Sequence, residues 1–122
     1  MSAKILIVED HEETRQLLGT LLEIEGYSVV FAEDGQAGYE VSRVEEPDLI
    51  LTDIGMLYMD GIEMIRMIRE SHDNRTIPVI VITAYGGSTK YQALEAGANA
   101  IIDKPLQFDW LLELIRKWIP IP

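Results

Sequence analysis

At four places in the sequence, polar residues directly follow a short apolar run. Their side chains could take part in one reaction if the fold brings them together. The side chains are the carboxylates of Glu9, Asp10 and Asp53, the hydroxyl of Thr83 and the ammonium of Lys104. Two carboxylates about 4 Å apart repel each other by roughly 4 kcal/mol at an effective dielectric constant of about 20, so three acids that meet need a cation. Carboxylate oxygens, with water and a backbone carbonyl, suit Mg²⁺. The sequence therefore predicts a magnesium site if these points converge.

A site of this composition could accept a phosphoryl group. Asp53 would be the nucleophile, since carboxylates form mixed anhydrides with phosphate. The ammonium of Lys104 matches one phosphoryl oxygen, and the hydroxyl of Thr83 can donate to another. Phosphoryl transfer has a loose transition state, so positioning and charge neutralisation do most of the catalysis.

Taken singly, each of these residues has a simpler interpretation. Glu9 and Asp10 would cap the helix that follows them, and Asp53 would be a solvated turn acid. Thr83 would be a buried hydroxyl bonded to the backbone, and Lys104 would belong to a surface loop. Five groups of matching chemistry at successive strand ends favour one shared site.

The elements that must position these groups alternate between strand and helix. Apolar runs predict strands at residues 5–8, 28–32, 49–51, 79–82 and 100–102. Apolar faces at helical spacing follow each run, and these faces include Leu17, Val44, Tyr91, Leu94 and Leu111. The alternation is typical of an α/β fold: a single doubly wound, five-stranded parallel sheet with five helices on both faces, flavodoxin-like. If the strand order is 2-1-3-4-5, ligands gather where the chain order reverses, outside the carboxyl ends of the strands.

Composition narrows the classes of function. The 122 residues, 48% of them hydrophobic, suffice for one domain with its own core, which we expect to be residues 1–122. The absence of cysteine excludes disulfides and thiolate metal sites. A net charge of −11 should repel nucleic acid and anionic membranes, although acidity also serves solubility alone. We expect a cytoplasmic protein that binds neither. Whether the chain is complete or an excised part of a longer one stays open.

The residues also match a known family. The set Glu9–Asp10, Asp53, Thr83–Ala84 and Lys104–Pro105 resembles the receiver domain of two-component response regulators, the CheY-like family. The segments ILIVED, PDLILTDIGMLYMDG, PVIVITA and GANAIIDKP resemble that family's segments in order and spacing. The resemblance implies that Asp53 accepts a phosphoryl group from a sensor histidine kinase or a histidine phosphotransfer protein in a Mg²⁺-dependent reaction, with Mn²⁺ possible. The phosphorylated domain would switch its output face. It would not be an enzyme in the usual sense, but would catalyse its own phosphorylation and slow autodephosphorylation.

The resemblance implies roles for the site residues. Asp10 and Asp53 would bind Mg²⁺ through their side chains, Gly55 through its backbone carbonyl and Glu9 through a metal-bound water. Lys104 and Thr83 would hold phosphoryl oxygens, and Thr83 would move inward on phosphorylation. The small Ala84 would leave room for the phosphoryl group. The bond between Lys104 and Pro105 would be cis, which only the resemblance implies, since about 5–6% of X-Pro bonds are cis in general.

The chain departs from the family at positions that affect signalling. Leu57 stands where the family usually has proline, and Ile101 stands where it often has the aromatic residue that acts as a rotameric switch. Gly55 and Tyr85 occupy two places that influence how fast water reaches the acyl phosphate. We therefore expect an atypical output switch.

Three other classes of protein compete with this interpretation. A flavodoxin-type electron carrier would need a phosphate cradle after the first strand, but residues 9–13 are EDHEE, which repels phosphate. A haloacid-dehalogenase-type phosphatase would need an acid where Gly55 stands. The main alternative is a receiver-like protein-binding module that acts without phosphorylation. The departures at Leu57 and Ile101 favour it, and the intact acid set argues against it.

Overall fold

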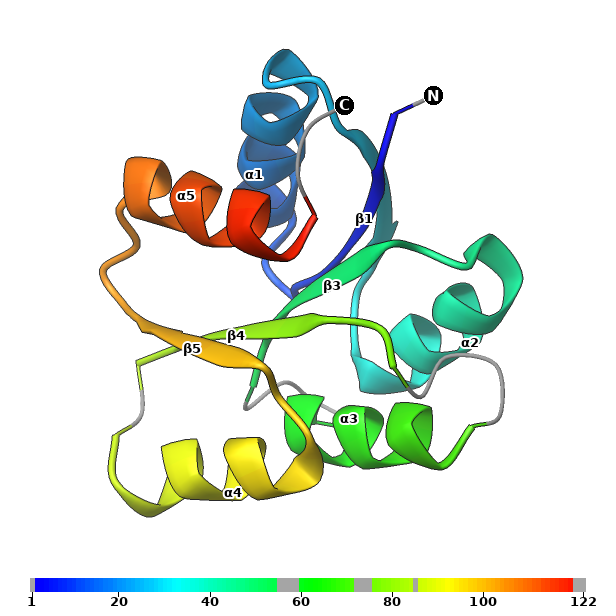
Figure 1. Ribbon diagram of the computed structural model, residues 1–122, viewed down its shortest axis with the longest axis vertical. Coiled ribbons are helices and arrows are strands. Elements are labelled where there is room, and N and C mark those ends of the chain that lie inside the picture. The colour runs from blue at the N-terminus through cyan, green and yellow to red at the C-terminus, as the bar shows by residue number, and fades with distance from the viewer. Residues whose placement is uncertain (1, 55–59, 72–75, 85, 120–122) are drawn as a thin grey trace.

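The computed structural model describes residues 2–54, 60–71, 76–84 and 86–119, in which strands and helices alternate (Figure 1). The strands are β1 (Lys4–Val8), β2 (Ser28–Ala32), β3 (Leu49–Asp53), β4 (Val79–Thr83) and β5 (Ala100–Asp103). The helices are α1 (Glu12–Ile24), α2 (Gly35–Glu45), α3 (Gly61–Glu70), α4 (Ser88–Ala96) and α5 (Phe108–Trp118).

All five strands run parallel in one sheet with the order β2-β1-β3-β4-β5. The expected fold class and strand order are confirmed. Three strands extend one or two residues beyond the predicted apolar runs: β3 includes Asp53, β4 includes Thr83 and β5 includes Asp103. Backbone pairing thus carries polar side chains to the ends of buried strands, with Asp53 opposite Ile82 and Thr83 opposite Asp103.

The sheet separates two hydrophobic cores, because successive residues of a strand face opposite sides. Ile5 and Ile7 of β1 lie in the core beneath α1 and α5, whereas Leu6 and Val8 lie in the core beneath α2, α3 and α4. Figure 1 shows α1 and α5 covering one face and the other three helices covering the opposite face. Strands buried on both faces explain the unbroken apolar runs in the sequence.

Not every residue on the predicted apolar helix faces is buried. The large hydrophobic side chains of Leu17, Val44, Tyr91 and Leu94 are 60%, 79%, 65% and 51% exposed. Helical spacing predicts which residues share a face, but not how far the sheet extends beneath it. Val44 lies on α2, which packs near the edge strand β2, so little sheet remains for it to cover.

Arg69, near the end of α3, ties three segments together at the amino ends of the strands. Its guanidinium donates to the carbonyl of Ile77 (2.6 Å), the carbonyl of Gly97 (2.7 Å) and Oδ1 of Asn99 (2.8 Å). Asn99 Oδ1 in turn accepts from the backbone N–H of Val79 (2.8 Å). This network holds the starts of β4 and β5 against α3.

Candidate functional site

The residues predicted to act together gather at the carboxyl edge of the sheet. Glu9 and Asp10 follow β1, Asp53 ends β3 and Thr83 ends β4. Lys104 follows β5, and its backbone N–H donates to the carbonyl of Thr83 at 2.9 Å. The parallel register brings these strand ends side by side, with Val8 of β1 opposite Thr52 of β3.

Asp53 and Lys104 form an ion pair at the centre of this edge. Lys104 Nζ lies 3.4 Å from Asp53 Oδ2, and Asp53 Oδ1 accepts the backbone N–H of Ile54 at 2.9 Å. The Asp53 side chain is only 15% exposed. Burial raises the pKa of Asp53 above its ordinary value, while the Lys104 ammonium and the Ile54 N–H act in the opposite direction. Lys104 therefore favours the ionised form of the Asp53 carboxylate against the effect of burial.

Glu9 is the most enclosed acid of the site, at 5% exposed. Its Oε2 accepts the backbone N–H of His11 at 3.0 Å. Burial raises the pKa of Glu9, and a hydrogen bond with Asp10 and the charge of Asp53 raise it further. Glu9 thus carries an electrostatic cost that a cation would relieve.

The donor chemistry of this cluster fits a hard divalent cation. Glu9, Asp10 and His11 each offer a ligand atom, and these atoms lie within 4.8 Å of one another. The Asp10 side chain remains 34% exposed, so solvent can reach the cluster. Carboxylate oxygens with access to water are the ligands that Mg²⁺ prefers. The His11 side chain is 81% exposed.

The remaining predicted residues occupy the surroundings of the ion pair. Thr83 is fully buried, and Ala84 beside it is exposed. The peptide bond between Lys104 and Pro105 is cis, as the resemblance implies. Ile101 is half-buried and packs against the core beneath α2, α3 and α4. The expectations for Gly55, Leu57 and Tyr85 lie outside the described residues.

A cavity of about 260 Å³ opens beside Lys104, between α1 and the segment that joins β5 to α5. Its lining combines charged and apolar side chains from Glu9, Thr14, Leu18, Ile82, Lys104, Pro105 and Leu106. Lys104 and Glu9 are therefore approachable from the side of α1.

Two residues that support the site were not predicted from the sequence. Gly61 packs beneath the end of β3, so closely that a Cβ there would lie 2.5 Å from the carbonyl oxygen of Asp53. Arg15 of α1 donates from Nη1 to the carbonyl of Glu9 at 2.8 Å. In the sequence Gly61 looks like any glycine ahead of an apolar helix face, and an arginine one turn into a helix has no distinctive signal.

Comparison with known proteins identifies the class to which this fold and site belong. The sequence profile described as "Response regulator receiver domain" matches residues 5–116. The chain belongs to this family and is a receiver domain of response regulators.

Individual relatives agree with this assignment. The chain is 38% identical over 117 residues to Response regulator PleD of Caulobacter vibrioides, covering 95% of this chain and 26% of PleD. It is 30% identical over 120 residues to the polar-differentiation response regulator DivK of Brucella ovis, covering 98% of both chains. It therefore spans about a quarter of PleD but nearly the whole of DivK.

A solved structure with a related sequence contains the expected ion. The receiver domain of sensor histidine kinase PA1611 from Pseudomonas aeruginosa is described with magnesium coordinated in its active site cleft. It is 29% identical, has a TM-score of 0.88, and the match covers 98% of each chain. Among the described residues of the present chain, no helix is long and apolar enough to cross a membrane.

Proposed function

We propose that the protein is a phosphoacceptor of a two-component signalling system, with Asp53 as the acceptor. The donor is a phosphohistidine on a sensor histidine kinase or a histidine phosphotransfer protein. The observation that carries this proposal is the half-buried Asp53 carboxylate with Lys104 Nζ 3.4 Å away, at the end of the strand that pairs with β1, which Glu9 and Asp10 follow. Residues 1–122 act as one receiver domain in the cytoplasm, and this domain does not itself bind nucleic acid.

The proposed reaction moves one phosphoryl group. An oxygen of ionised Asp53 attacks phosphorus, an O–P bond forms, and the N–P bond of the phosphohistidine breaks. The histidine nitrogen keeps the electron pair and takes a proton from solvent. Water later attacks the acyl phosphate, which releases inorganic phosphate and restores the carboxylate.

The side chains of this chain prepare that reaction. Lys104 favours the ionised form of Asp53 against the effect of burial, and then holds a phosphoryl oxygen together with Thr83. The exposed Ala84 leaves space for the incoming group. Asp10, Asp53, the Gly55 carbonyl and, through water, Glu9 would hold the cation. Bound Mg²⁺ or Mn²⁺ supplies neutralisation of the acids and of the phosphoryl oxygens.

The test is phosphorylation by a small acyl-phosphate donor. With Mg²⁺, the intact mass should rise by one phosphoryl group, and EDTA should prevent this. Asp53→Asn should abolish the change, whereas Asp103→Asn should not, because Asp103 at the end of β5 pairs with Lys90 (2.6 Å). A wild-type protein that gains no mass, or an Asp53→Asn variant that gains as much, would remove the basis of the proposal.

The same experiment addresses the alternative of a binding module that acts without phosphorylation. That alternative rests on two departures from the family, Leu57, which lies outside the described residues, and Ile101, which stands where an aromatic switch is expected and packs against the core. A protein that keeps its partner but never gains a phosphoryl group would favour it. A partner whose affinity changes on phosphorylation of Asp53 would exclude it.

A further inference from the structure

The outer edge of β2 is open in the described part of the chain, where β2 pairs with β1 alone. Its sequence is SVVFA, without charge, proline or glycine. Natural proteins usually protect such edges with lysine, proline or a bulge, because an exposed edge is a template for another strand. This edge has none of these protections, although it is composed of residues that favour strands.

The hydrogen bonds of β2 show which backbone groups are available. The N–H of Ser28 donates to the carbonyl of Ala3 (2.9 Å), and the carbonyl of Ala32 accepts from the N–H of Glu9 (3.1 Å). Residues of a parallel strand bond alternately to one side and the other. Ser28, Val30 and Ala32 therefore face β1, and the N–H and C=O groups of Val29 and Phe31 face outward.

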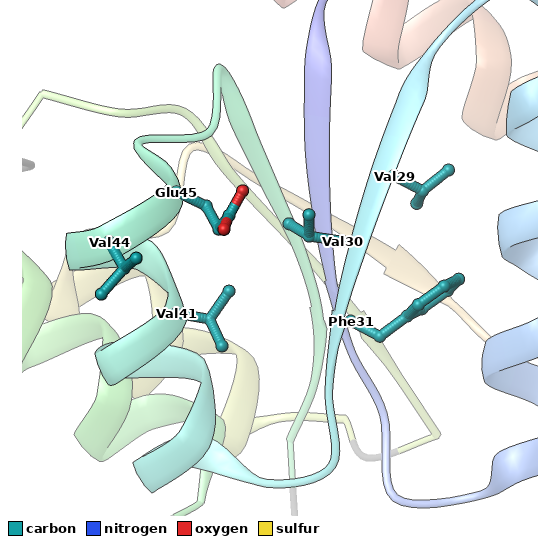
Figure 2. A pocket seen from close by; sticks show the side chains of 6 residues that line it. All are labelled: Val29, Val30, Phe31, Val41, Val44 and Glu45. Carbon is teal, nitrogen blue, oxygen red and sulfur yellow. The ribbon is translucent and has the colours of Figure 1, made fainter.

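Apolar side chains flank this edge on both faces of the sheet. They line a groove of about 540 Å³ formed by Val29, Val30, Phe31, Val41, Val44 and Glu45. Figure 2 shows Val41, Val44 and Glu45 of α2 together with Val30 on one side of the strand, and Val29 and Phe31 on the other. Phe31 is 42% exposed and Val44 is 79% exposed. An added strand would therefore find apolar contacts for its side chains on both faces.

The rim of the groove is acidic. Glu45 lines the groove, and the exposed Glu33, Glu40 and Glu46 lie within two residues of its lining residues in the sequence. The nearby cations are already engaged: Lys4 Nζ pairs with Glu45 Oε1 at 3.1 Å, Arg15 Nη2 lies 4.0 Å from Glu33 Oε1, and Arg43 lies 5.7 Å above the Tyr39 ring. A second copy of this chain, also with a net charge of −11, would bring the same acids together. The charge therefore favours a basic occupant over self-association.

We propose that the outer edge of β2 and its groove bind an extended, basic segment of a partner protein, which adds to the sheet as a sixth strand. Apolar side chains of the segment pack on Val44 and Phe31, its backbone pairs with Val29 and Phe31, and flanking lysines or arginines face the acidic rim. This surface lies on the side of β2 away from β3, which carries Asp53.

The test uses a synthetic peptide, acetyl-Lys-Arg-Val-Thr-Val-Thr-Val-Arg-Lys-amide, and the full chain labelled with ¹⁵N. Binding should slow amide hydrogen exchange at Val29 and Phe31, and leave Val30, which already bonds to β1, unchanged. The affinity should fall with added salt. A peptide with glutamate in place of every lysine and arginine should bind at least about tenfold more weakly, as should a peptide N-methylated on its pairing residues.

Two exposed substitutions distinguish this groove from apolar surface in general. Val44→Asn should weaken peptide binding by about tenfold, since it removes apolar contact area. Ile24→Asn changes a 72% exposed residue at the end of α1 and should have no effect. Circular dichroism would verify that both variants fold.

Each contrary outcome overturns the proposal. These outcomes are no detectable binding, shifts confined to α1 and α5, equal binding of the acidic peptide, and equal loss in the two variants. A dimer seen by sedimentation and dissolved by Val44→Asn would assign the groove to a second copy instead.

Discussion

The close packing of Gly61 beneath the acceptor gives the sharpest test of how the fold positions the site. Gly61 is the first residue of α3, and an alanine Cβ there would lie 2.5 Å from the carbonyl oxygen of Asp53 and 2.6 Å from Cγ2 of Ile54. The first of these distances is about 0.9 Å short of the 3.4 Å at which ordinary van der Waals contact begins. The oxygen belongs to the backbone of β3, so either α3 or the end of the strand must move.

The magnitude follows from two opposing effects. Overpacking in a close-packed interior costs about 1–3 kcal/mol, and replacing glycine by alanine in a helix returns up to about 1 kcal/mol. These limits give a net loss of about 0–3 kcal/mol. Because the contacted oxygen is backbone and cannot move aside cheaply, Gly61→Ala should lower the free energy of unfolding by about 1–2 kcal/mol, the middle of this range, and Tm by roughly 3–10 °C for a domain of this size. Since a misplacement of about 1 Å can reduce a rate by up to roughly 10²-fold, phosphorylation of Asp53 should slow by more than the stability loss explains.

The assay combines thermal unfolding with the rate of phosphorylation by a small acyl-phosphate donor. Gly86→Ala is the matched control, because a Cβ at Gly86 meets no atom within 4 Å. It should leave both quantities close to wild type. If Gly61→Ala matches Gly86→Ala in Tm and in rate, the contact between α3 and β3 does not position the acceptor.

Three further substitutions test the electrostatics. Burial raises the pKa of Glu9, as do Asp10 and Asp53, so the folded, metal-free protein favours the neutral form of Glu9 more than the unfolded chain does. The free energy of unfolding should therefore fall as the pH rises from the ordinary value of 4.5 through the raised one, and Glu9→Gln should reduce this fall in denaturant titrations with EDTA. Lys104→Met should raise the pKa of Asp53 further, as measured by NMR titration, and slow its phosphorylation. Arg69→Met should lower the free energy of unfolding by about 2–4 kcal/mol in chemical denaturation, because carbonyls at the starts of β4 and β5 lose a charged donor.

Matched controls exist for the two cationic residues. Lys90→Met breaks a pair with Asp103 outside the site and should leave the pKa of Asp53 unchanged. Arg116→Met breaks a surface pair with Glu25 and should cost less than about 1 kcal/mol. The reasoning fails if either control matches its site counterpart, or if Glu9→Gln keeps the wild-type dependence of stability on pH.

The arrangement of the sheet was predictable because the central strands are buried on both faces. Ile5–Val8 and Val79–Ile82 are therefore continuous apolar runs, and each run stops where polar residues begin. Parallel strands bring such ends to one edge, which is why Asp53 and Lys104 could be placed together before their 3.4 Å contact was known.

The features that were not predictable depend on distances between segments far apart in the sequence. Val44 continues a helical apolar face, yet it is 79% exposed because α2 lies against the last strand of the sheet. Gly61 looks like any glycine at a helix start, and only its approach to Asp53 gives it a special role. Arg69 looks like a solvated helix residue, and its carbonyl partners are 8 and 28 residues away.

The two ends of the sheet differ in how well their charged groups are compensated. This difference bears on how phosphorylation could change the conformation of the domain. At the carboxyl end, burial raises the pKa of both Glu9 and Asp53, so the ionised forms of these carboxylates are less favourable there than in water. At the amino end, the guanidinium of Arg69 is satisfied by carbonyls that begin β4 and β5. A change of charge at Asp53, at the end of β3, therefore acts beside the carboxyl ends of β4 and β5, while the amino ends of those two strands stay anchored. Since Thr83 and Ile101 lie on those two strands, we expect phosphorylation to shift their carboxyl-terminal halves without separating the strands from α3.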